Sequence, residues 1–191
     1  MDSLAHQLDA LRTTVEDFRG HLPTVELTGK KLAATLAGGG KIMTCGNGGS
    51  ACDALHLTEE LVGRFDKNRR SLAALCLCAD APLLTCIAND FGYDTVFARQ
   101  IEGLGRAGDA LVIFTTSGNS ANLVAALQAG RKKGLTTISL LGKDGGKCKV
   151  LADHDIIIPS HTTARIQEVH TFVLHVWLGL IEKELGLIPP G

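Results

Sequence analysis

Residues 41–50 read KIMTCGNGGS, a short apolar run followed by a loop that contains three glycines. Apolar runs of this length that end at glycine are typical of buried strands. The chain carries four more such runs, and a stretch long enough for a helix separates each from the next. They lie at residues 72–76, 110–114, 136–140 and 156–158. Five strands that alternate with helices predict a parallel, doubly wound sheet of the α/β class.

The segment before the predicted sheet has the pattern of an amphipathic helix. Its apolar residues recur at spacings of four, three, four and three, and they are Leu4, Leu8, Leu11, Val15 and Phe18. Such a stripe lies on one face of a helix and has to pack on another surface. That surface is either the chain's own sheet or a second copy of the chain. Because a compact monomer would leave much of this apolar surface exposed, we expect an oligomer.

Two more helices complete the expected organisation. One runs from about Thr24 to the glycines at 38–40, and a long one runs from about Thr163 to Glu184. At 191 residues the chain fits a single domain. We expect that domain to consist of a helical extension at 1–38, a sheet core at 39–160, and a C-terminal helix and tail at 161–191.

Composition argues against several classes of protein. Hydrophobic residues make up 45% of the chain and charged residues 20%, which is typical of a globular protein. The formal net charge is -1 and Lys and Arg form only short runs, so we expect no binding to nucleic acid. The sequence shows neither a long apolar run nor a secretory signal, so we expect no membrane span and a cytoplasmic location. The six cysteines include no C-x-x-C pair and are expected to be small buried residues.

Two loops that follow predicted strands are rich in groups that bind anions. The first, at residues 45–50, leads into a helix whose N-terminus favours negative charge. The second reads TTSGNS at residues 115–120 and offers four hydroxyls. Either loop alone is as consistent with a turn or a helix cap as with a ligand site. Because open α/β sheets bind ligands at the carboxyl ends of strands, the two loops together favour a site for a phosphate monoester.

A pair of side chains on the helix after the first loop could bind a metal or transfer protons. His56 and Glu60 lie four residues apart and share one helix face, with Arg64 expected one turn further along it. The neighbouring Glu59 points about 100 degrees away and is expected in solvent or at an interface. A solvated helix face is the simpler interpretation of this pair.

The last helix carries Gln167 and His175 among apolar residues, and buried polar groups need partners. Eight residues of helix rise about 12 Å and turn by about 80 degrees net. The two side chains can therefore meet one ligand only by leaning together or by coming from different subunits. Their spacing leaves both arrangements open.

Six motifs together resemble the phosphoheptose isomerases, and the resemblance covers nearly the whole chain. They are GNGGS at 46–50, HLTEEL at 56–61, NDFG at 89–92, TSGNSAN at 116–122, GKDGG at 142–146 and RIQE at 165–168. The resemblance implies the SIS (sugar isomerase) fold and a homotetramer with active sites at subunit contacts. It also implies conversion of sedoheptulose 7-phosphate to D-glycero-D-manno-heptose 7-phosphate, which supplies ADP-heptose for lipopolysaccharide core synthesis.

The same resemblance implies roles for individual residues. Glu60 and His175 match the family's catalytic acid/base residues, which would move a proton between C1 and C2 of the sugar through an enediol. One zinc ion per subunit would be bound by His56, Glu60, Gln167 and His175. The phosphate would contact Thr115, Thr116, Ser117 and Ser120. The rest of the substrate would contact Asn47, Gly48, Gly49, Ser50, Glu60, Arg64, Asn89, Asp90 and Gln167.

Two positions depart from the family pattern. Thr115 stands where relatives often have Ser, which keeps a hydroxyl, and Ala164 stands where some carry Asp, which removes a polar contact. Two other functions fit the same fold. One is a non-catalytic SIS protein that binds a replication initiator, although such relatives lack the complete acid/base set. The other is an isomerase of a shorter phosphosugar, which would use the same phosphate loop.

Overall fold

The computed structural model describes residues 3–187 and contains a five-stranded sheet. The strands are β1 Ile42–Gly46, β2 Ala74–Cys76, β3 Ala110–Phe114, β4 Thr136–Gly142 and β5 His154–Ile158. All neighbours are parallel, and the strand order is β2-β1-β3-β4-β5. The chain therefore winds outward from β1 in one direction and from β3 in the other. This confirms the predicted parallel, doubly wound α/β fold.

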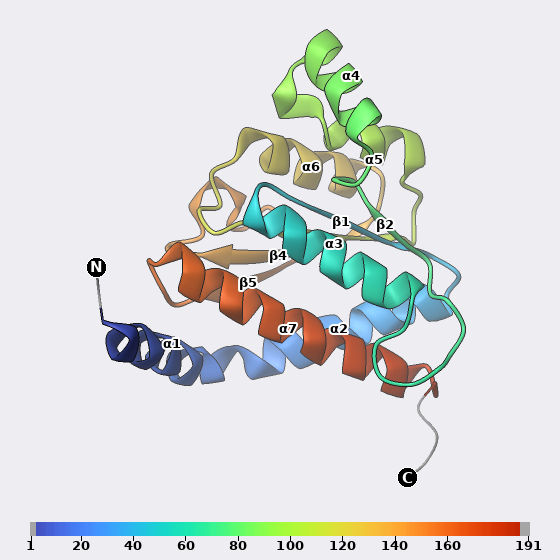
Figure 1. Ribbon diagram of the computed structural model, residues 1–191. Coiled ribbons are helices and arrows are strands. Elements are labelled where there is room, and N and C mark those ends of the chain that lie inside the picture. The colour runs from blue at the N-terminus through green and yellow to red at the C-terminus, as the bar shows by residue number, and fades with distance from the viewer. Residues whose placement is uncertain (1–2, 188–191) are drawn as a thin grey trace.

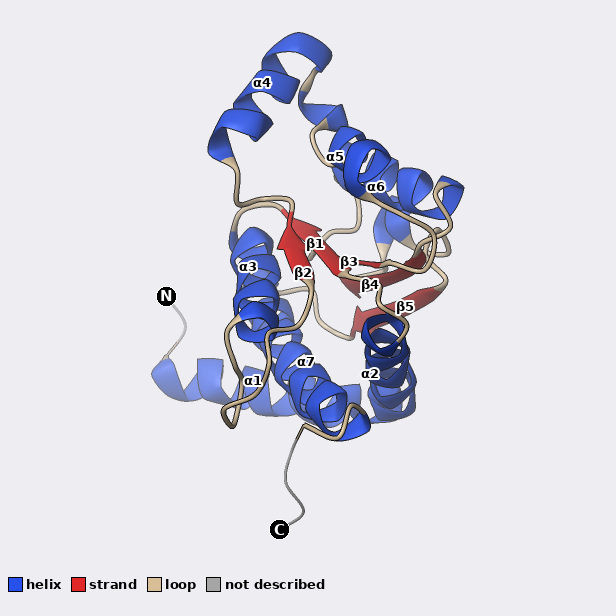
Figure 2. Ribbon diagram, turned by 90° about the vertical axis from the view of Figure 1, so that its right-hand side faces the viewer, coloured by secondary structure: helices blue, strands red, loops and turns tan. Residues whose placement is uncertain are grey.

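Helices cover both faces of the sheet (Figure 1, Figure 2). One face carries α2 Leu22–Ala37, α3 Gly49–Val62 and α7 Thr163–Glu184, with α1 Leu4–Phe18 beside them. The other face carries α4 Ala81–Phe91, α5 Ala98–Leu104 and α6 Ala121–Lys132. Short 3-10 turns are η1 Arg19–His21, η2 Tyr93–Thr95 and η3 Gly146–Cys148. The N-terminal helices and the long last helix are present as predicted.

The strands divide their side chains between two hydrophobic cores. In β3, Val112 and Phe114 pack toward α2, α3 and α7, whereas Leu111 and Ile113 pack toward α5 and α6. All four side chains are fully buried. Because both faces of the sheet are covered, the strand is apolar throughout instead of alternating with polar residues. This arrangement explains why the strands appear in the sequence as continuous apolar runs.

Helix α7, which carries several candidate site residues, is fixed closely against α2. A Cβ atom at Gly29 would lie 2.7 Å from Leu180 Cδ1, so the two helices approach closely because this residue is glycine. The Trp177 indole N–H donates to the Val25 carbonyl at 3.1 Å and to the Thr28 hydroxyl at 3.0 Å. These contacts set the position of α7 beside α3.

Some element boundaries differ from the predicted ones. Strand β2 spans three residues instead of five because, at the sheet edge, it pairs only with the first part of β1. Helix α2 begins at Leu22 instead of Thr24, with Pro23 in its first turn, where a missing N–H breaks no helical hydrogen bond. Residues 188–191 of the predicted C-terminal tail, and residues 1–2 of the predicted extension, lie outside the described residues.

The prediction that the cysteines are buried holds for only part of the set. Cys45, Cys76 and Cys148 are buried, but Cys52 and Cys86 are exposed because they lie on the outer faces of α3 and α4. That prediction is therefore wrong for the latter two. Within residues 3–187, no helix combines the length and the apolar character that crossing a membrane requires.

Helices α1 and α4 bury little of their surface in this chain. The buried residues of α1 are Thr14 and Phe18, and Leu4 and Leu8 of its apolar stripe are 89% and 68% exposed. Helix α4 buries only Ile87 and rises away from the sheet at the top of Figure 1. Most of the α1 stripe thus finds no cover within the chain.

Candidate functional site

The two polar loops meet at the carboxyl ends of the neighbouring strands β1 and β3. Strand order reverses at this point, and a crevice opens there in doubly wound sheets. A pocket of about 260 Å³ lies between the loops and the start of α7. Its lining residues are Asn47, Gly49, Ser50, Phe114, Thr115, Thr116, Ser117, Ser120, Thr163 and Gln167. One chain thus gathers all four predicted phosphate-binding residues at one place.

Backbone contacts hold the second loop in shape. The Thr115 N–H donates to the Leu140 carbonyl at 2.9 Å, and the Gly118 N–H donates to the Thr115 hydroxyl at 3.1 Å. Gly118 has a φ of +64°, and a Cβ there would lie 1.9 Å from the Gly145 carbonyl oxygen, so this position requires glycine. Ser120 is the N-cap residue of α6, but its side chain makes no capping hydrogen bond within the described structure. Its hydroxyl is therefore free to bind a ligand.

Helices α3 and α7 run side by side in the same direction, as Figure 1 shows, and their residues pair at steps of about one turn. At the pocket end, a Cβ on Gly49 would lie 2.4 Å from the amide nitrogen of Gln167, so this side chain lies directly against the glycine loop. One turn further on, the Thr171 hydroxyl donates to Asp53 Oδ1 at 3.0 Å. These pairings hold the two helices in a fixed register.

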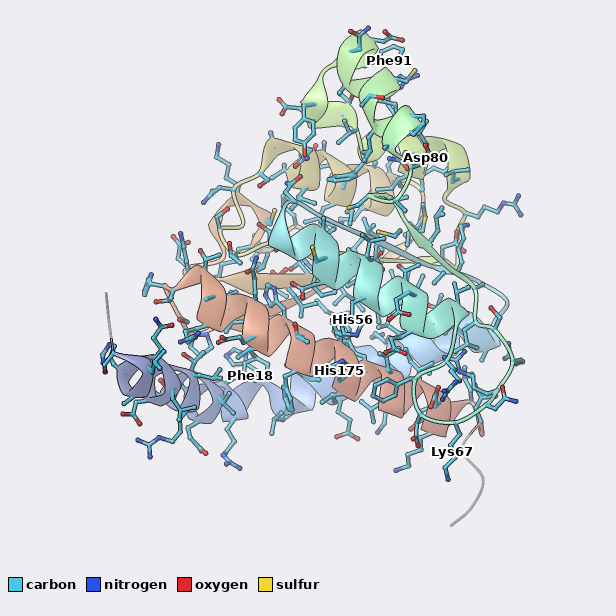
Figure 3. All side chains as sticks on the ribbon, in the orientation of Figure 1. Phe18, His56, Lys67, Asp80, Phe91 and His175 are labelled. Carbon is cyan, nitrogen blue, oxygen red and sulfur yellow. The ribbon has the colours of Figure 1, made fainter. Side chains whose placement is uncertain are left out.

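The next turn brings the imidazoles of His56 and His175 together (Figure 3), and the carboxylate of Glu60 lies beside them. His56 Nε2 lies 3.4 Å from His175 Nε2 and 3.7 Å from Glu60 Oε1. The Phe65 ring stacks on His175, with ring centroids 5.7 Å apart. Glu59 is exposed as expected, but its carboxylate comes within 4.8 Å of the ligand atoms of His56 and Glu60. The expectation that Glu59 points away from the pair is therefore wrong.

The chemistry of this cluster fits a zinc ion. Tetrahedral ligands bound at about 2.0–2.1 Å from zinc lie about 3.3 Å from one another. The spacings of 3.4 Å and 3.7 Å around His56 are close to that value. Two imidazole nitrogens at such a distance also need a proton or a cation between them, because their lone pairs would otherwise repel each other. Three of the four expected ligands thus come together within one chain, whereas Gln167 lies about 12 Å along α7 from His175.

Arg64 does not share the helix face of His56 and Glu60. Helix α3 ends at Val62, and the backbone of Gly63 leaves the helical conformation at a ψ of -106°. Arg64 therefore lies in the following loop, where its guanidinium donates to the Asp66 carbonyl at 3.2 Å. The expectation that Arg64 continues the same face of the helix is wrong for this reason.

Asn89 and Asp90 also lie away from the pocket of their own chain. Both are exposed in the last turn of α4, where the Asn89 amide donates to the Asp90 carboxylate at 2.7 Å. Figure 3 shows the adjacent Phe91 at the outer tip of α4, far from His56 and His175. In one chain, this part of the predicted substrate site is therefore separate from the rest.

Sequence reasoning missed two buried ionisable groups near the site. Burial raises the pKa of Asp53, although the hydrogen bond from Thr171 opposes that shift. Asp53 Oδ2 is buried without a hydrogen-bond partner in the described structure. Burial also lowers the pKa of His170 to about 4, so that its ring is neutral at pH 7. The His170 ring packs edge-on against Phe114, directly beneath the pocket.

The sequence of the chain is similar to known proteins along most of its length. The sequence profile of the SIS domain family matches residues 8–142. A phosphoheptose isomerase of Sodalis glossinidius is 44% identical over 188 residues, which covers 96% of each chain. One from Nitratiruptor is 48% identical over 168 residues, or 88% of each chain. The chain belongs to the phosphoheptose isomerase family of SIS domain proteins. The resemblance inferred from the six motifs is thereby confirmed.

Solved structures of the phosphoheptose isomerase family share this fold. The phosphoheptose isomerase of Francisella tularensis superimposes with a TM-score of 0.88 at 29% identity, over 96% of this chain and all of that one. The enzyme of Neisseria gonorrhoeae gives 0.86 at 39% identity, over 94% of this chain and 97% of that one. The SIS fold predicted from the motifs is therefore confirmed along nearly the whole chain.

Proposed function

We propose that this chain converts sedoheptulose 7-phosphate to D-glycero-D-manno-heptose 7-phosphate. The proposal rests on two sets of groups that lie at different points along the contact between helices α3 and α7, which we call the α3–α7 seam. At one end of this seam are hydroxyls and helix N-termini that are suited to bind a phosphate. His56, Glu60 and His175 gather two turns further along it. Such a site can hold a phosphate at one end of a substrate and exchange protons at the other.

The reaction moves protons and leaves the carbon skeleton intact. A base removes a proton from C1 of the ketose while the C2 carbonyl oxygen gains one, which gives an enediol. The O1 hydroxyl then loses its proton, C1 becomes the aldehyde, and C2 receives a proton. We assign these transfers to Glu60 and His175, since a carboxylate and an imidazole can both exchange protons near neutral pH. A zinc ion held by His56, Glu60 and His175 would polarise the carbonyl and stabilise negative charge on its oxygen, with Gln167 as the fourth ligand only if it comes from a neighbouring subunit.

The distance along α7 supports a long substrate over a short one. Gln167 at the phosphate end and His175 at the proton-transfer end are eight residues apart, about 12 Å of helix. A seven-carbon chain extends further from its phosphate than a shorter phosphosugar does. The complete set of His56, Glu60, Gln167 and His175 likewise favours an enzyme over a non-catalytic SIS protein that binds a replication initiator.

We further propose that the chain works as a homotetramer with sites at subunit contacts. Leu4 and Leu8 are largely exposed, and beside the stripe runs an apolar groove that includes Val15, Phe18 and Phe172. A second copy would cover this surface with its own helices α1 and α2, and exposed Asn89 and Asp90 could then reach the pocket of a neighbouring subunit. The product would supply ADP-heptose for lipopolysaccharide core synthesis, which implies a cytoplasmic location.

The proposal is tested by incubating the chain with sedoheptulose 7-phosphate in deuterated water, with and without zinc. NMR then follows both product formation and deuterium entry at C1 and C2. We expect turnover by the wild type and its loss in His175→Ala and Glu60→Gln. Glu102→Gln is the matched control, because it makes the same change at an exposed residue of α5, away from the cluster, and should retain most activity.

A folded wild type that gives neither product nor exchange under both metal conditions would refute the heptose assignment. Turnover of a shorter ketose phosphate in the same assay would then identify the chain as an isomerase of a shorter phosphosugar. Inactivity toward all of them would favour a binding protein. Turnover that survives in both active-site variants would retain the reaction and reject our catalytic residues.

A further inference from the structure

A hydrogen-bonded network joins three segments at the rim of the pocket. Asn47, in the glycine loop after β1, accepts hydrogen bonds at Oδ1 from the Tyr93 hydroxyl at 2.9 Å and from Asn122 Nδ2 at 3.0 Å. Its own Nδ2 donates to Asn122 Oδ1 at 3.0 Å. Asn122 lies in the first turn of α6 and is 2% exposed, so it holds Asn47 from the buried side.

The number of hydrogen bonds limits what Asn47 can offer to a ligand. A side-chain amide has two acceptor sites on its oxygen and two N–H donors on its nitrogen. Tyr93 and Asn122 occupy both acceptor sites of Asn47, and Asn122 also takes one donor. One N–H of Asn47 remains, and Asn47 lines the pocket. The ligand atom that meets Asn47 must therefore be a hydrogen-bond acceptor.

Tyr93 adds a second constraint from the outer side of the pocket. Its side chain belongs to η2, which directly follows α4, and it is 59% exposed. Because its proton is donated to Asn47, the phenol oxygen keeps lone pairs that can accept a hydrogen bond from a sugar hydroxyl. A donor on Asn47 thus lies beside an acceptor on Tyr93. This pattern matches a carbon chain that carries successive oxygen substituents.

We propose that Tyr93 and Asn122 are positioning residues, which fix Asn47 as a hydrogen-bond donor to an oxygen of the sugar chain. Tyr93 additionally determines specificity at the pocket rim. The inference rests on the proposed function in one respect, namely that the ligand is a phosphosugar. The phosphate itself would bind the loop at 115–120, whereas Asn47, held by Asn122 and Tyr93, would recognise the carbon chain that extends from it.

The test separates recognition of the sugar chain from recognition of the phosphate. Dissociation constants are measured by calorimetry for sedoheptulose 7-phosphate and for inorganic phosphate, together with KM and kcat where turnover occurs. For Tyr93→Phe we expect about five- to tenfold weaker sugar-phosphate binding and a similar rise in KM, which is the effect of one hydrogen bond. The dissociation constant for phosphate and kcat should each change by less than about twofold, and the melting temperature by less than about 1 °C.

Two further variants make the assignment specific. Asn47→Asp replaces the remaining donor with an acceptor, and we expect it to weaken sugar-phosphate binding more than Tyr93→Phe does. The effects of Tyr93→Phe and Asn47→Asp should be less than additive in the double variant, because Asn47→Asp already removes the part of the Tyr93 effect that acts through Asn47. Asp94→Asn is the control, because Asp94 is an exposed neighbour of Tyr93 in the same turn.

Unchanged sugar-phosphate affinity in Tyr93→Phe would overturn the proposal. An equal loss of phosphate and sugar-phosphate binding with a lower melting temperature would also overturn it, because it would reduce Tyr93 to a structural role. The direct binding measurement keeps this test separate from that of the proposed function. A wild type that binds the sugar phosphate without isomerising it would refute the reaction, while the Tyr93 comparison would still decide this inference.

Discussion

Helices α3 and α7 pack polar side chains against each other, whereas helices α1 and α4 leave most of their residues, apolar ones included, exposed. Along the α3–α7 seam, the Thr171 hydroxyl donates to Asp53 at 3.0 Å, and the Nε2 atoms of His56 and His175 lie 3.4 Å apart. Helix α1 instead leaves Leu4 89% exposed, and α4 buries only Ile87. One chain therefore builds the pocket and brings His56, Glu60 and His175 together, whereas Asn89 and Asp90 lie apart from both. In the proposed oligomer, a second copy would bring those two residues to the site.

The seam should be most sensitive to loss of its central imidazole. We predict that His56→Ala lowers kcat by about 10²–10⁴-fold, because it removes a group that holds both His175 and Glu60 in place. Bound zinc, measured by elemental analysis, should fall with it. The control His154→Ala changes an imidazole at the start of β5, away from the seam, and should keep both readouts. Wild-type activity in His56→Ala would show that catalysis does not depend on the imidazole at the centre of the α3–α7 seam.

Substitutions in the exposed stripe on α1 should have the next largest effect. We expect them to impair assembly of the oligomer but not folding of the chain. Leu8→Glu combined with Val15→Glu places two unpaired charges in an apolar contact, where burying each of them is costly. We expect sedimentation to show smaller species with unchanged helix content and reduced activity. Thr13→Glu, which lies on another side of α1 and is also exposed, should leave assembly intact. A wild type that sediments as a monomer would show that the α1 stripe does not mediate assembly.

Within the pocket, one glycine tests how far backbone packing alone shapes the site. Gly118→Ala would place a Cβ 1.9 Å from the Gly145 carbonyl oxygen at a φ of +64°. We predict a loss of about 2–4 kcal/mol in the free energy of unfolding, measured by urea denaturation, together with weaker phosphate binding. Gly20→Ala is the control, because its Cβ would meet no atom within 4 Å. Equal stability of the two variants would show that the loop adjusts freely.

The smallest effect is expected at the amino-terminal edge of the sheet, opposite the site. Burial alone would raise the pKa of Asp109, but the Lys41 ammonium and the N–H groups of Lys41 and Arg106 lower it below its ordinary value. Because the folded pKa is lowered, this stabilisation is present above the unfolded pKa and is lost as the pH falls through the folded pKa. Asp109→Asn should cost about 1–3 kcal/mol at pH 7.

Acidification supplies the check on this assignment. The stability difference between Asp109→Asn and the wild type should shrink when unfolding is measured near pH 3, whereas activity per folded molecule should not change. Asp17→Asn, at an exposed carboxylate of α1, serves as the control. A difference that stays constant with pH would show that the Lys41–Asp109 pair does not stabilise the fold through its charge.

Much of the fold could be predicted because its signals are local in sequence. Continuous apolar runs marked the strands, and the glycine loop at 46–50 marked the turn into α3. The site was less predictable because its pairings join distant residues: Asn47 to Asn122 across 75 positions, and Asp53 to Thr171 across 118. An isolated Asp or Asn in a helix gives no sign of such a partner. Only the contact of α3 with α7 reveals that their residues align turn by turn.

Two site assignments depended on details that periodicity does not contain. Helical spacing placed Arg64 on the face of His56, but the chain leaves the helix at Gly63. Spacing also left open whether Gln167 and His175 meet. The structure puts Gln167 against Gly49 and His175 against His56, two turns apart along the contact of α3 with α7.

The claim that a second copy completes the site is tested most directly by mixing two inactive variants. His175→Ala removes a seam residue and Asp90→Asn removes a candidate residue on α4, and each is assayed alone with sedoheptulose 7-phosphate. The two proteins are then unfolded together at equal amounts, refolded and assayed again. If each site takes His175 and Asp90 from different subunits, random mixing restores about a quarter of the sites. Activity that stays at the level of the separate variants would contradict the account and place both residues in one chain's site.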